Sequence, residues 1–333
     1  MTTRAALAEA LREAGPDLSF RPRALFRAAE SLGHADASLG LLLATDGLAG
    51  ALHSAPPEVR ARIAEGDLLT GSAHPGGQLR RTGGEGYVLS GCWVAVPAAT
   101  SADWFALGAE RDDGGPPEPV LVLLPAGVAG VSPRTGTGLD GADARHLAAR
   151  DVAVPAEHVL PAFGPVPGPA PLPPVVAVRC AVTGVALGLA RRALSEFAET
   201  ARQRSRLGEV TRMSEQPVLR TELNRVVLSF RAARRLVLTE LEGLPPDGDG
   251  QEAVPVALRT GLAAALLHAH GVAIDAVRFA FGKSGGSSLY SGHSMEGHWR
   301  DAEELACHHL FSERAEREIA SAQFGDHVSP VWL

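Results

Sequence analysis

The residues whose types and spacing could do chemistry lie in Gly285–Phe311, GGSSLYSGHSMEGHWRDAEELACHHLF. A glycine- and serine-rich turn leads there into a predicted helix with an Arg-Asp pair and a His-His pair. Residues three and four apart share a helix face, so Asp301, Glu304 and His308 should lie together. An imidazole beside carboxylates can move a proton near neutral pH. The pattern indicates a proton-handling site, and a solvated helix face is the alternative.

Two further groups are candidates for binding phosphate. Gly285, Gly286 and Ser287 could cradle a phosphate or ribose, because glycine lets the backbone approach a ligand. Arg204 stands near the end of a predicted helix, where a guanidinium can meet a pyrophosphate. A simple turn and a surface arginine are the alternatives. The histidines near the predicted last helix lack zinc spacing, so the sequence predicts no metal site.

Composition limits the class of protein. The chain has 333 residues, 45% hydrophobic content and a formal net charge of -7, which argues against a nucleic-acid binder. Cys92, Cys180 and Cys307 are far apart and odd in number, as expected in a reducing compartment. The N-terminus has no apolar signal core, and Arg179 interrupts the most apolar run, Val175–Ala190. We therefore expect a cytoplasmic protein without a membrane span.

The residue pattern changes along the chain from helical segments to short strand-like runs and back to long helical segments. These changes predict four parts. We expect an N-terminal helical domain at 1–66, a β-domain at 67–163, a proline-rich linker at 164–174 and a four-helix bundle at 175–333. The predicted helices are Ala5–Ala14, Pro22–Leu32, Ala35–His53, Glu58–Glu65, Val175–Arg206, Glu215–Glu242, Glu252–Phe281 and Ser294–Gln323. The strand candidates are Tyr87–Leu89, Trp93–Val96, Trp104–Ala109, Val120–Leu124 and Val152–Val154, spaced as in a small antiparallel barrel or sandwich.

This order of elements resembles the acyl-CoA dehydrogenase superfamily, and most of all its flavin-dependent monooxygenase branch. The likeness runs from about residue 28 to 324. The stretches that carry it are Thr70–Gly76, Gly86–Trp93, Ala190–Arg204 and Trp299-Arg300-Asp301 with His308 seven residues after the Asp. The resemblance implies an α-helical protein with an inserted β-domain, and an N-terminal domain shorter than is typical. It also implies a homodimer or homotetramer in which neighbouring bundles complete each other's cofactor sites.

The resemblance further implies a flavin, FAD or FMN, bound between the β-domain and the bundle and reduced by a separate flavin reductase. The implied catalytic residues are His308, with Asp301 and Arg300 beside it. The implied cofactor contacts are Ser72, Trp93, Ala98, Arg204, Gly285, Gly286 and Ser287. His308 would deprotonate a small organic or pathway-tethered substrate, or donate a hydrogen bond during oxygen transfer.

Two other functions stay open. Many dehydrogenases of the family that this chain resembles carry a glutamate base eight residues after the Arg-Asp aspartate, and His309 stands there. Glu240 and Glu304 are candidates for a relocated base, and the spacing singles out neither. Pro97, Ala142 and Ala144 stand where the resemblance implies hydroxyl-bearing residues that contact the flavin. A flavin-free homologue that acts as a partner subunit, or in redox-neutral chemistry, is therefore the third hypothesis.

Overall fold

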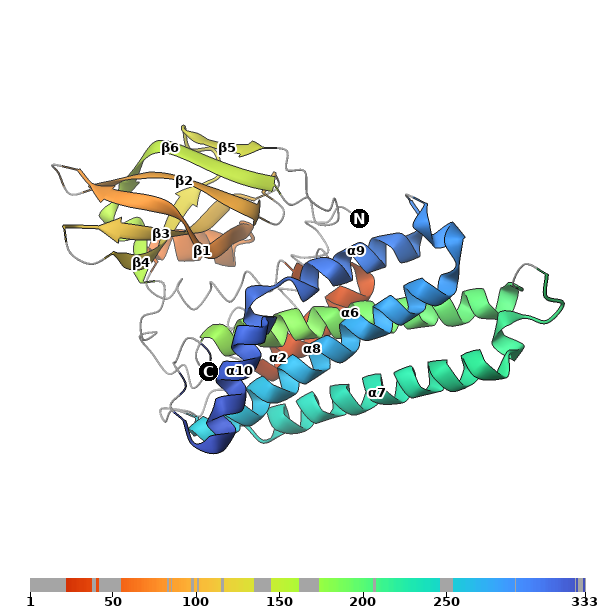
Figure 1. Cartoon of the computed structure of the whole chain (residues 1–333). Coiled ribbons are helices and arrows are strands. Elements are labelled where there is room, and N and C mark those ends of the chain that lie inside the picture. The colour runs from red at the N-terminus through yellow and green to blue at the C-terminus, as the bar shows by residue number, and fades with distance from the viewer. Residues whose placement is uncertain are drawn as a thin grey trace.

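The computed structural model describes residues 22–37, 40–41, 55–82, 84, 86–96, 99–100, 102–114, 117–134, 145–161, 174–205, 208–245, 254–290, 292–326, 328 and 332. The predicted helix Ala5–Ala14 and most of Ala35–His53 lie outside these residues, as do 164–173 of the predicted linker. In chain order the described part has helices, a β-sheet and a helical bundle (Figure 1). This order confirms the predicted fold class, while the four domain boundaries remain a prediction.

The sheet has seven strands in the order β5-β6-β2-β1-β3-β4-β7. The strands are β1 Leu69–Arg81, β2 Gly86–Val96, β3 Trp104–Asp112, β4 Glu118–Pro125, β5 Val131–Arg134, β6 Arg145–Pro155 and β7 Val159–Pro161. Pairing is antiparallel except between β1 and β3, which run parallel, so a purely antiparallel sheet was a wrong prediction. The two candidates Tyr87–Leu89 and Trp93–Val96 are parts of one strand, β2.

Trp93 is the largest side chain buried in the sheet's own core. It is 1% exposed, and its Nε1 donates a hydrogen bond to the carbonyl oxygen of Gly108 at 2.7 Å. A Cβ atom on Gly76 or Gly77 would lie within 2.8 Å of this indole, so glycine is needed on β1 where the ring packs. The glycines of β1 thus explain both its place in the sheet and its weak strand signal in the sequence.

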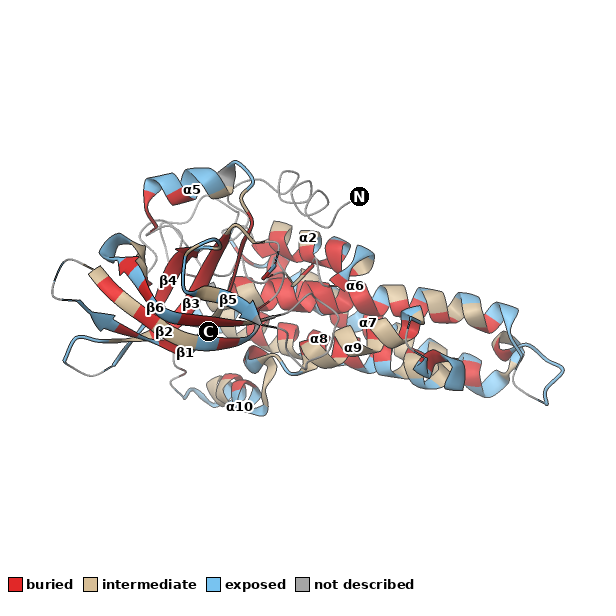
Figure 2. Cartoon of the chain, turned by 90° about the horizontal axis from the view of Figure 1, so that it is seen from above, coloured by how far each residue is buried: buried red, intermediate tan, exposed pale blue. Residues whose placement is uncertain are grey.

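The helices form a bundle with one N-terminal helix packed against it (Figures 1 and 2). The bundle helices are α6 Pro174–Gln203, α7 Pro217–Glu242, α8 Val256–Ser284, α9 Ser294–Ala306 and α10 Glu313–Ser321, and the N-terminal helix is α2 Pro22–Ala35. Helix α5 Pro57–Ala64 packs on the sheet instead, where its Val59 shares a core with Leu69 and Trp104 (Figure 2). Helix α2 shares the main hydrophobic core with α6 and α8, and its buried Glu30 receives two hydrogen bonds from Arg234 of α7, at 2.6 and 2.9 Å. The bundle therefore holds α2 by apolar packing and by an ion pair.

The predicted last helix, Ser294–Gln323, is wrong as a single helix. Helix α9 ends at Ala306, and a short 3-10 turn, η6 His309–Phe311, precedes α10. Nδ1 of His308 accepts a hydrogen bond from the backbone N–H of Leu310 at 3.3 Å, which satisfies an N–H group at the start of the turn. His308 therefore does not share a helix with Asp301 and Glu304, and the predicted common face of the three is wrong.

Within the described residues, α8 alone is long and apolar enough to cross a membrane by length and composition. Of its most apolar window, 56% is buried among other helices. The core helix of a bundle has the same composition.

Candidate functional site

His308 lies in a cluster of rings between the bundle helices and the η6 turn. The half-buried imidazole stacks on His309 with ring centroids 4.8 Å apart and meets the Phe311 ring edge-on at 5.8 Å. Burial lowers the pKa of His308 to about 3, and His309, His270 and Arg179 lower it further. The ring is therefore neutral at physiological pH. Because Nδ1 accepts from Leu310, the ring proton sits on Nε2, which is a hydrogen-bond donor.

Helix α8 and helix α6 contribute the other polar groups of this cluster. His270 stacks on Phe311 at 3.8 Å, and its Nε2 lies 3.2 Å from the carbonyl oxygen of Leu305. Burial lowers the pKa of His270 to about 4, so this ring is also neutral. Arg179 is fully buried beside Cys180, and burial lowers its pKa to about 10. The cluster thus combines two neutral imidazoles with one guanidinium cation.

Asp301 lies in a different environment. Burial raises its pKa to about 7, with further raising by Glu304, Asp36 and Glu296, while Arg192 acts in the opposite direction. Burial also raises the pKa of Glu304. Among the described residues no hydrogen bond, ion pair or ring contact joins Asp301 to His308, so the geometry does not support the predicted role of Asp301 in orienting that histidine.

The raised pKa of Asp301 predicts a pH dependence of stability. An acid with a higher pKa in the folded protein adds stability below its unfolded pKa, here 3.8, and that stability is lost as the pH rises through about 7. We expect the unfolding free energy of Asp301→Asn to fall less than that of the wild type as the pH rises. At about pH 8 the variant should be more stable than the wild type by about 1–3 kcal/mol. Urea unfolding of both proteins at acidic and alkaline pH measures the difference. Parallel stability curves would contradict the assignment.

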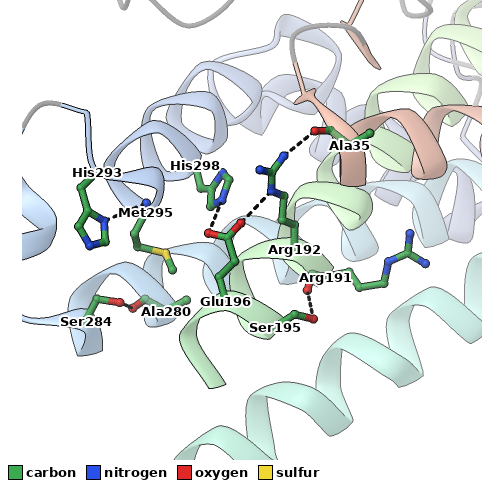
Figure 3. A network of polar contacts seen from close by, with 10 residues as sticks. All are labelled: Ala35, Arg191, Arg192, Ser195, Glu196, Ala280, Ser284, His293, Met295 and His298. Carbon is green, nitrogen blue, oxygen red and sulfur yellow. Dashed lines mark hydrogen bonds and ion pairs between the residues drawn. The ribbon is translucent and has the colours of Figure 1, made fainter. Parts of the chain in front are cut away.

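A second polar network lies where α2 ends against α6 and α9 (Figure 3). Glu196 accepts hydrogen bonds from Nε2 of His298 at 3.0 Å and from Nε of Arg192 at 2.9 Å. Arg192 also donates to the carbonyl oxygen of Ala35. An open groove of about 470 Å³ runs beside this network and is lined by His34, Ala35, Arg192, Ser195 and Glu196. The groove offers both signs of charge to a polar ligand.

The predicted phosphate contacts come together at the end of the bundle that lies away from the β-sheet (Figure 1). Nη1 of Arg204, just after α6, lies 3.3 Å from Oγ of Ser287, which belongs to the turn after α8. All four predicted residues here are exposed, and a Cβ atom on Gly285 or Gly286 would meet nothing within 4 Å. Gly285 has φ +85°, a conformation that favours glycine. A guanidinium, a hydroxyl and an open glycine turn can together hold an anion.

The flavin contacts predicted in the β-domain have less support from the structure than the phosphate contacts. Ser72 is half-buried on β1, where the pairing with β3 shifts register between Ser72 and Gly77. The indole of Trp93 is inside the sheet's core, so a flavin contact through its ring is a wrong prediction. Ala98 lies outside the described residues.

Residues 180–313 match the family described as acyl-CoA dehydrogenase, C-terminal domain. Solved structures resemble nearly the whole chain. XiaF from Streptomyces sp., in complex with FADH2 and glycerol, is 20% identical with a TM-score of 0.80, covering 98% of this chain and 96% of that chain. The HsaA monooxygenase from M. tuberculosis is 17% identical with a TM-score of 0.77, covering 100% and 99%. Butyryl-CoA dehydrogenase from Megasphaera elsdenii is 20% identical with a TM-score of 0.70, covering 90% and 81%.

The chain has the acyl-CoA dehydrogenase fold. A comparison with curated protein sequences finds no match. On this fold the predicted residues Arg204 and Ser287 are brought together. The predicted catalytic Arg300 instead pairs with Glu296 of its own helix.

Sequence reasoning missed the polar groups that surround His308. In the sequence Arg179 only interrupts an apolar run, and His270 stands inside the predicted helix Glu252–Phe281 without any further signal. A charged residue inside an otherwise apolar helix was the available signal, because an arginine is almost never fully buried without a reason. The Arg192–Glu196 pair, four residues apart on α6, was a second such signal.

Proposed function

We propose that this protein is a flavin-dependent oxidoreductase that works as a reduced-flavin monooxygenase on a small organic or pathway-tethered substrate. The observation that carries the proposal is His308, a neutral imidazole whose Nδ1 accepts from Leu310 and whose Nε2 therefore carries the ring proton. His309, not a glutamate, follows it. Two similar proteins, the HsaA monooxygenase and XiaF in its complex with FADH2, support the same function.

The residues present fit a flavin in its phosphate part. Arg204, Ser287 and the open turn at Gly285-Gly286 form a donor set for phosphate oxygens. Strand β1 lies at the other end of the molecule from this turn (Figure 1), so Ser72 of a neighbouring copy of the chain would hold the edge of the ring. A bound reduced flavin would supply the reaction with O₂ and the transfer of one oxygen atom.

His308 is then the group that acts on the substrate. Its Nε2–H would donate a hydrogen bond to a substrate oxygen, while the Leu310 N–H fixes the opposite nitrogen and thus the tautomer. A base whose pKa is about 3 is too weak to hold a phenol proton, so His308 orients the substrate and does not store its proton. Phe311, packed on both histidines, would keep water away from the reacting oxygen.

The proposed partners follow from the same function. A separate flavin reductase would supply the reduced cofactor, and the protein would work in the cytoplasm. A second copy of this chain would cover the apolar side chains exposed on α7, which are Val218, Leu228 and Leu236. Pairing through such a surface would give the homodimer or homotetramer that we expect.

A dehydrogenase with a relocated base is the second candidate, and one observation favours it. Glu304 is half-buried with a raised pKa, as suits a carboxylate that removes a proton near neutral pH. Glu240, the other glutamate considered, lies beside Gly261 where α7 meets α8. Glu304 is therefore the residue to test for this activity.

An isotope experiment separates the candidates. The purified protein would receive chemically reduced FMN or FAD, ¹⁸O₂ and a panel of phenols, indoles and aromatic amines, with butyryl-CoA as a separate substrate. The proposal expects a product that carries one ¹⁸O atom. Formation of an enoyl thioester without O₂ would instead establish the dehydrogenase, and a protein that neither binds flavin nor turns over would leave the flavin-free partner subunit.

A further inference from the structure

Arg179 of α6 holds two backbone carbonyl groups from different segments of the chain. The side chain is fully buried, its Nε lies 3.4 Å from the carbonyl oxygen of Leu310 in η6, and its Nη1 donates to the carbonyl oxygen of Trp332. Removing a guanidinium from water is unfavourable, so these hydrogen bonds are what keep it inside. Because the guanidinium is planar and its donors are fixed, it sets the distance between the two carbonyls that it holds.

Leu310 connects Arg179 to His308. The carbonyl oxygen of Leu310 accepts from Arg179, while the N–H of Leu310 donates to Nδ1 of His308 at 3.3 Å. The Leu310 side chain is itself buried, so this residue has little freedom to turn. On the other side of His308, Nε2 of His270 lies 3.2 Å from the carbonyl oxygen of Leu305. Two side chains of the bundle therefore hold the backbone on both sides of His308.

Trp332 is anchored independently of Arg179. The guanidinium carbon of Arg314 lies 5.7 Å from the centroid of the Trp332 ring, and Arg314 is in the first turn of α10, directly after η6. The Trp332 ring also packs on a small apolar cluster between α8 and α10, made of Ala263, Ile319 and Val328. The carbonyl of Trp332 is therefore a fixed point against which Arg179 can hold Leu310.

We infer that Arg179 is a positioning residue for His308: by joining Leu310 to Trp332 it fixes the η6 turn, and with it the direction in which the His308 imidazole points. The docking of Trp332 and the orientation of His308 are thereby coupled through one guanidinium. The inference rests on the proposed function only where it predicts a rate, since the geometry of the turn can be measured without turnover.

The ring nitrogens of His308 report this geometry directly. In protein labelled with ¹⁵N-histidine, the wild-type ring should show one tautomer with the proton on Nε2, because Leu310 donates to Nδ1. Arg179→Lys keeps the charge but has no planar fork to bridge two carbonyls. We expect averaged signals from both tautomers in this variant, and exchange of the Leu310 amide proton at least about tenfold faster than in the wild type. His308→Ala identifies the His308 signals by their loss.

Trp332→Ala tests the coupling from the other side. It removes the ring that Arg314 and the apolar cluster hold, while Arg179 is unchanged. We expect it to cause the same loss of the single tautomer as Arg179→Lys, with little further change when both substitutions are combined. Thr183→Val is the matched control, because it removes a buried hydrogen bond to the carbonyl oxygen of Leu266 from the same helix as Arg179. It should leave the His308 signals as in the wild type.

Turnover separates positioning from a general loss of structure. Arg179→Lys should lower kcat for oxygenation by about tenfold to a hundredfold, the usual effect of displacing a group that acts on the substrate, and should leave flavin affinity unchanged. In a His308→Ala background the same substitution should cost nothing further, because the group that it positions is already absent. Thr183→Val should keep the rate of its parent in both backgrounds.

A single wild-type tautomer in Arg179→Lys or in Trp332→Ala would overturn the inference. An equal loss of rate with and without His308 would also overturn it, because a purely structural arginine lowers the folded fraction in both backgrounds. If Arg179→Lys does not fold, Trp332→Ala carries the test alone. Failure of the proposed function has a different signature, which is no oxygenation by any variant while the tautomer signals still respond to Arg179→Lys.

Discussion

Replacing His308 by alanine is expected to lower oxygenation by about a hundredfold to a thousandfold, the usual effect of losing an aimed donor in an active site. The structure gives the reason, because the imidazole is neutral, its Nε2 carries the proton and the η6 turn fixes its position. His308→Gln retains a side-chain N–H donor and should recover part of the activity. Product formation with reduced flavin under O₂ measures both variants.

The neighbouring histidine is the matched control for this result. His309 is exposed and stacks on His308, so His309→Ala should cost much less activity. Flavin affinity should be unchanged in each variant, because the phosphate donors lie around Arg204 and Ser287. The rate should also be insensitive to His308 titration between about pH 5 and 8, since the ring is already neutral there. Full turnover by His308→Ala would remove the assigned role.

The second large effect concerns stability. Gly188 of α6 lies against α2 so closely that a Cβ atom would stand 2.2 Å from the carbonyl oxygen of Glu30 and 2.5 Å from the backbone nitrogen of His34. Backbone atoms on both sides cannot move independently of their helices. We expect Gly188→Ala to separate α2 from α6 and to lower the free energy of unfolding by about 2–4 kcal/mol. Urea denaturation measures the change.

Gly271 in the middle of α8 provides the comparison. A Cβ atom there would meet nothing within 4 Å, so Gly271→Ala should raise the unfolding free energy by up to about 1 kcal/mol through helix propensity. The two substitutions are chemically identical and differ only in their surroundings. Equal stability of the two variants would show that α2 does not depend on this close contact.

The sequence predicted the helices best where proline marks their starts. Pro22, Pro57, Pro174 and Pro217 each begin a helix of the structure, close to the predicted bounds. Strand β1 was missed because its glycines serve the packing of a tryptophan fifteen or more residues away, which no local pattern records. The break after Ala306 was missed for a related reason. No glycine or proline marks it, and buried Leu310 lies in the turn that follows.

The candidate site was only partly predictable. The resemblance led to Arg204 and Ser287, which lie 83 positions apart in sequence and meet in the structure. The same resemblance placed a tryptophan at the flavin, although its indole is enclosed by the sheet. The cluster of Arg179, His270 and His308 comes from three segments far apart in the chain. Only tertiary packing brings such groups together, and it also decides their charge states.

Titration of the purified protein with FAD and FMN, oxidised and reduced, tests the central claim most directly. The account predicts saturable binding in the range of about micromolar dissociation constants, weakened about tenfold or more by Arg204→Met through loss of the phosphate contact. Flavin fluorescence and absorption report the oxidised forms, and anaerobic absorption reports the reduced ones. No spectral change at high flavin concentration, with either cofactor in either redox state, would contradict it.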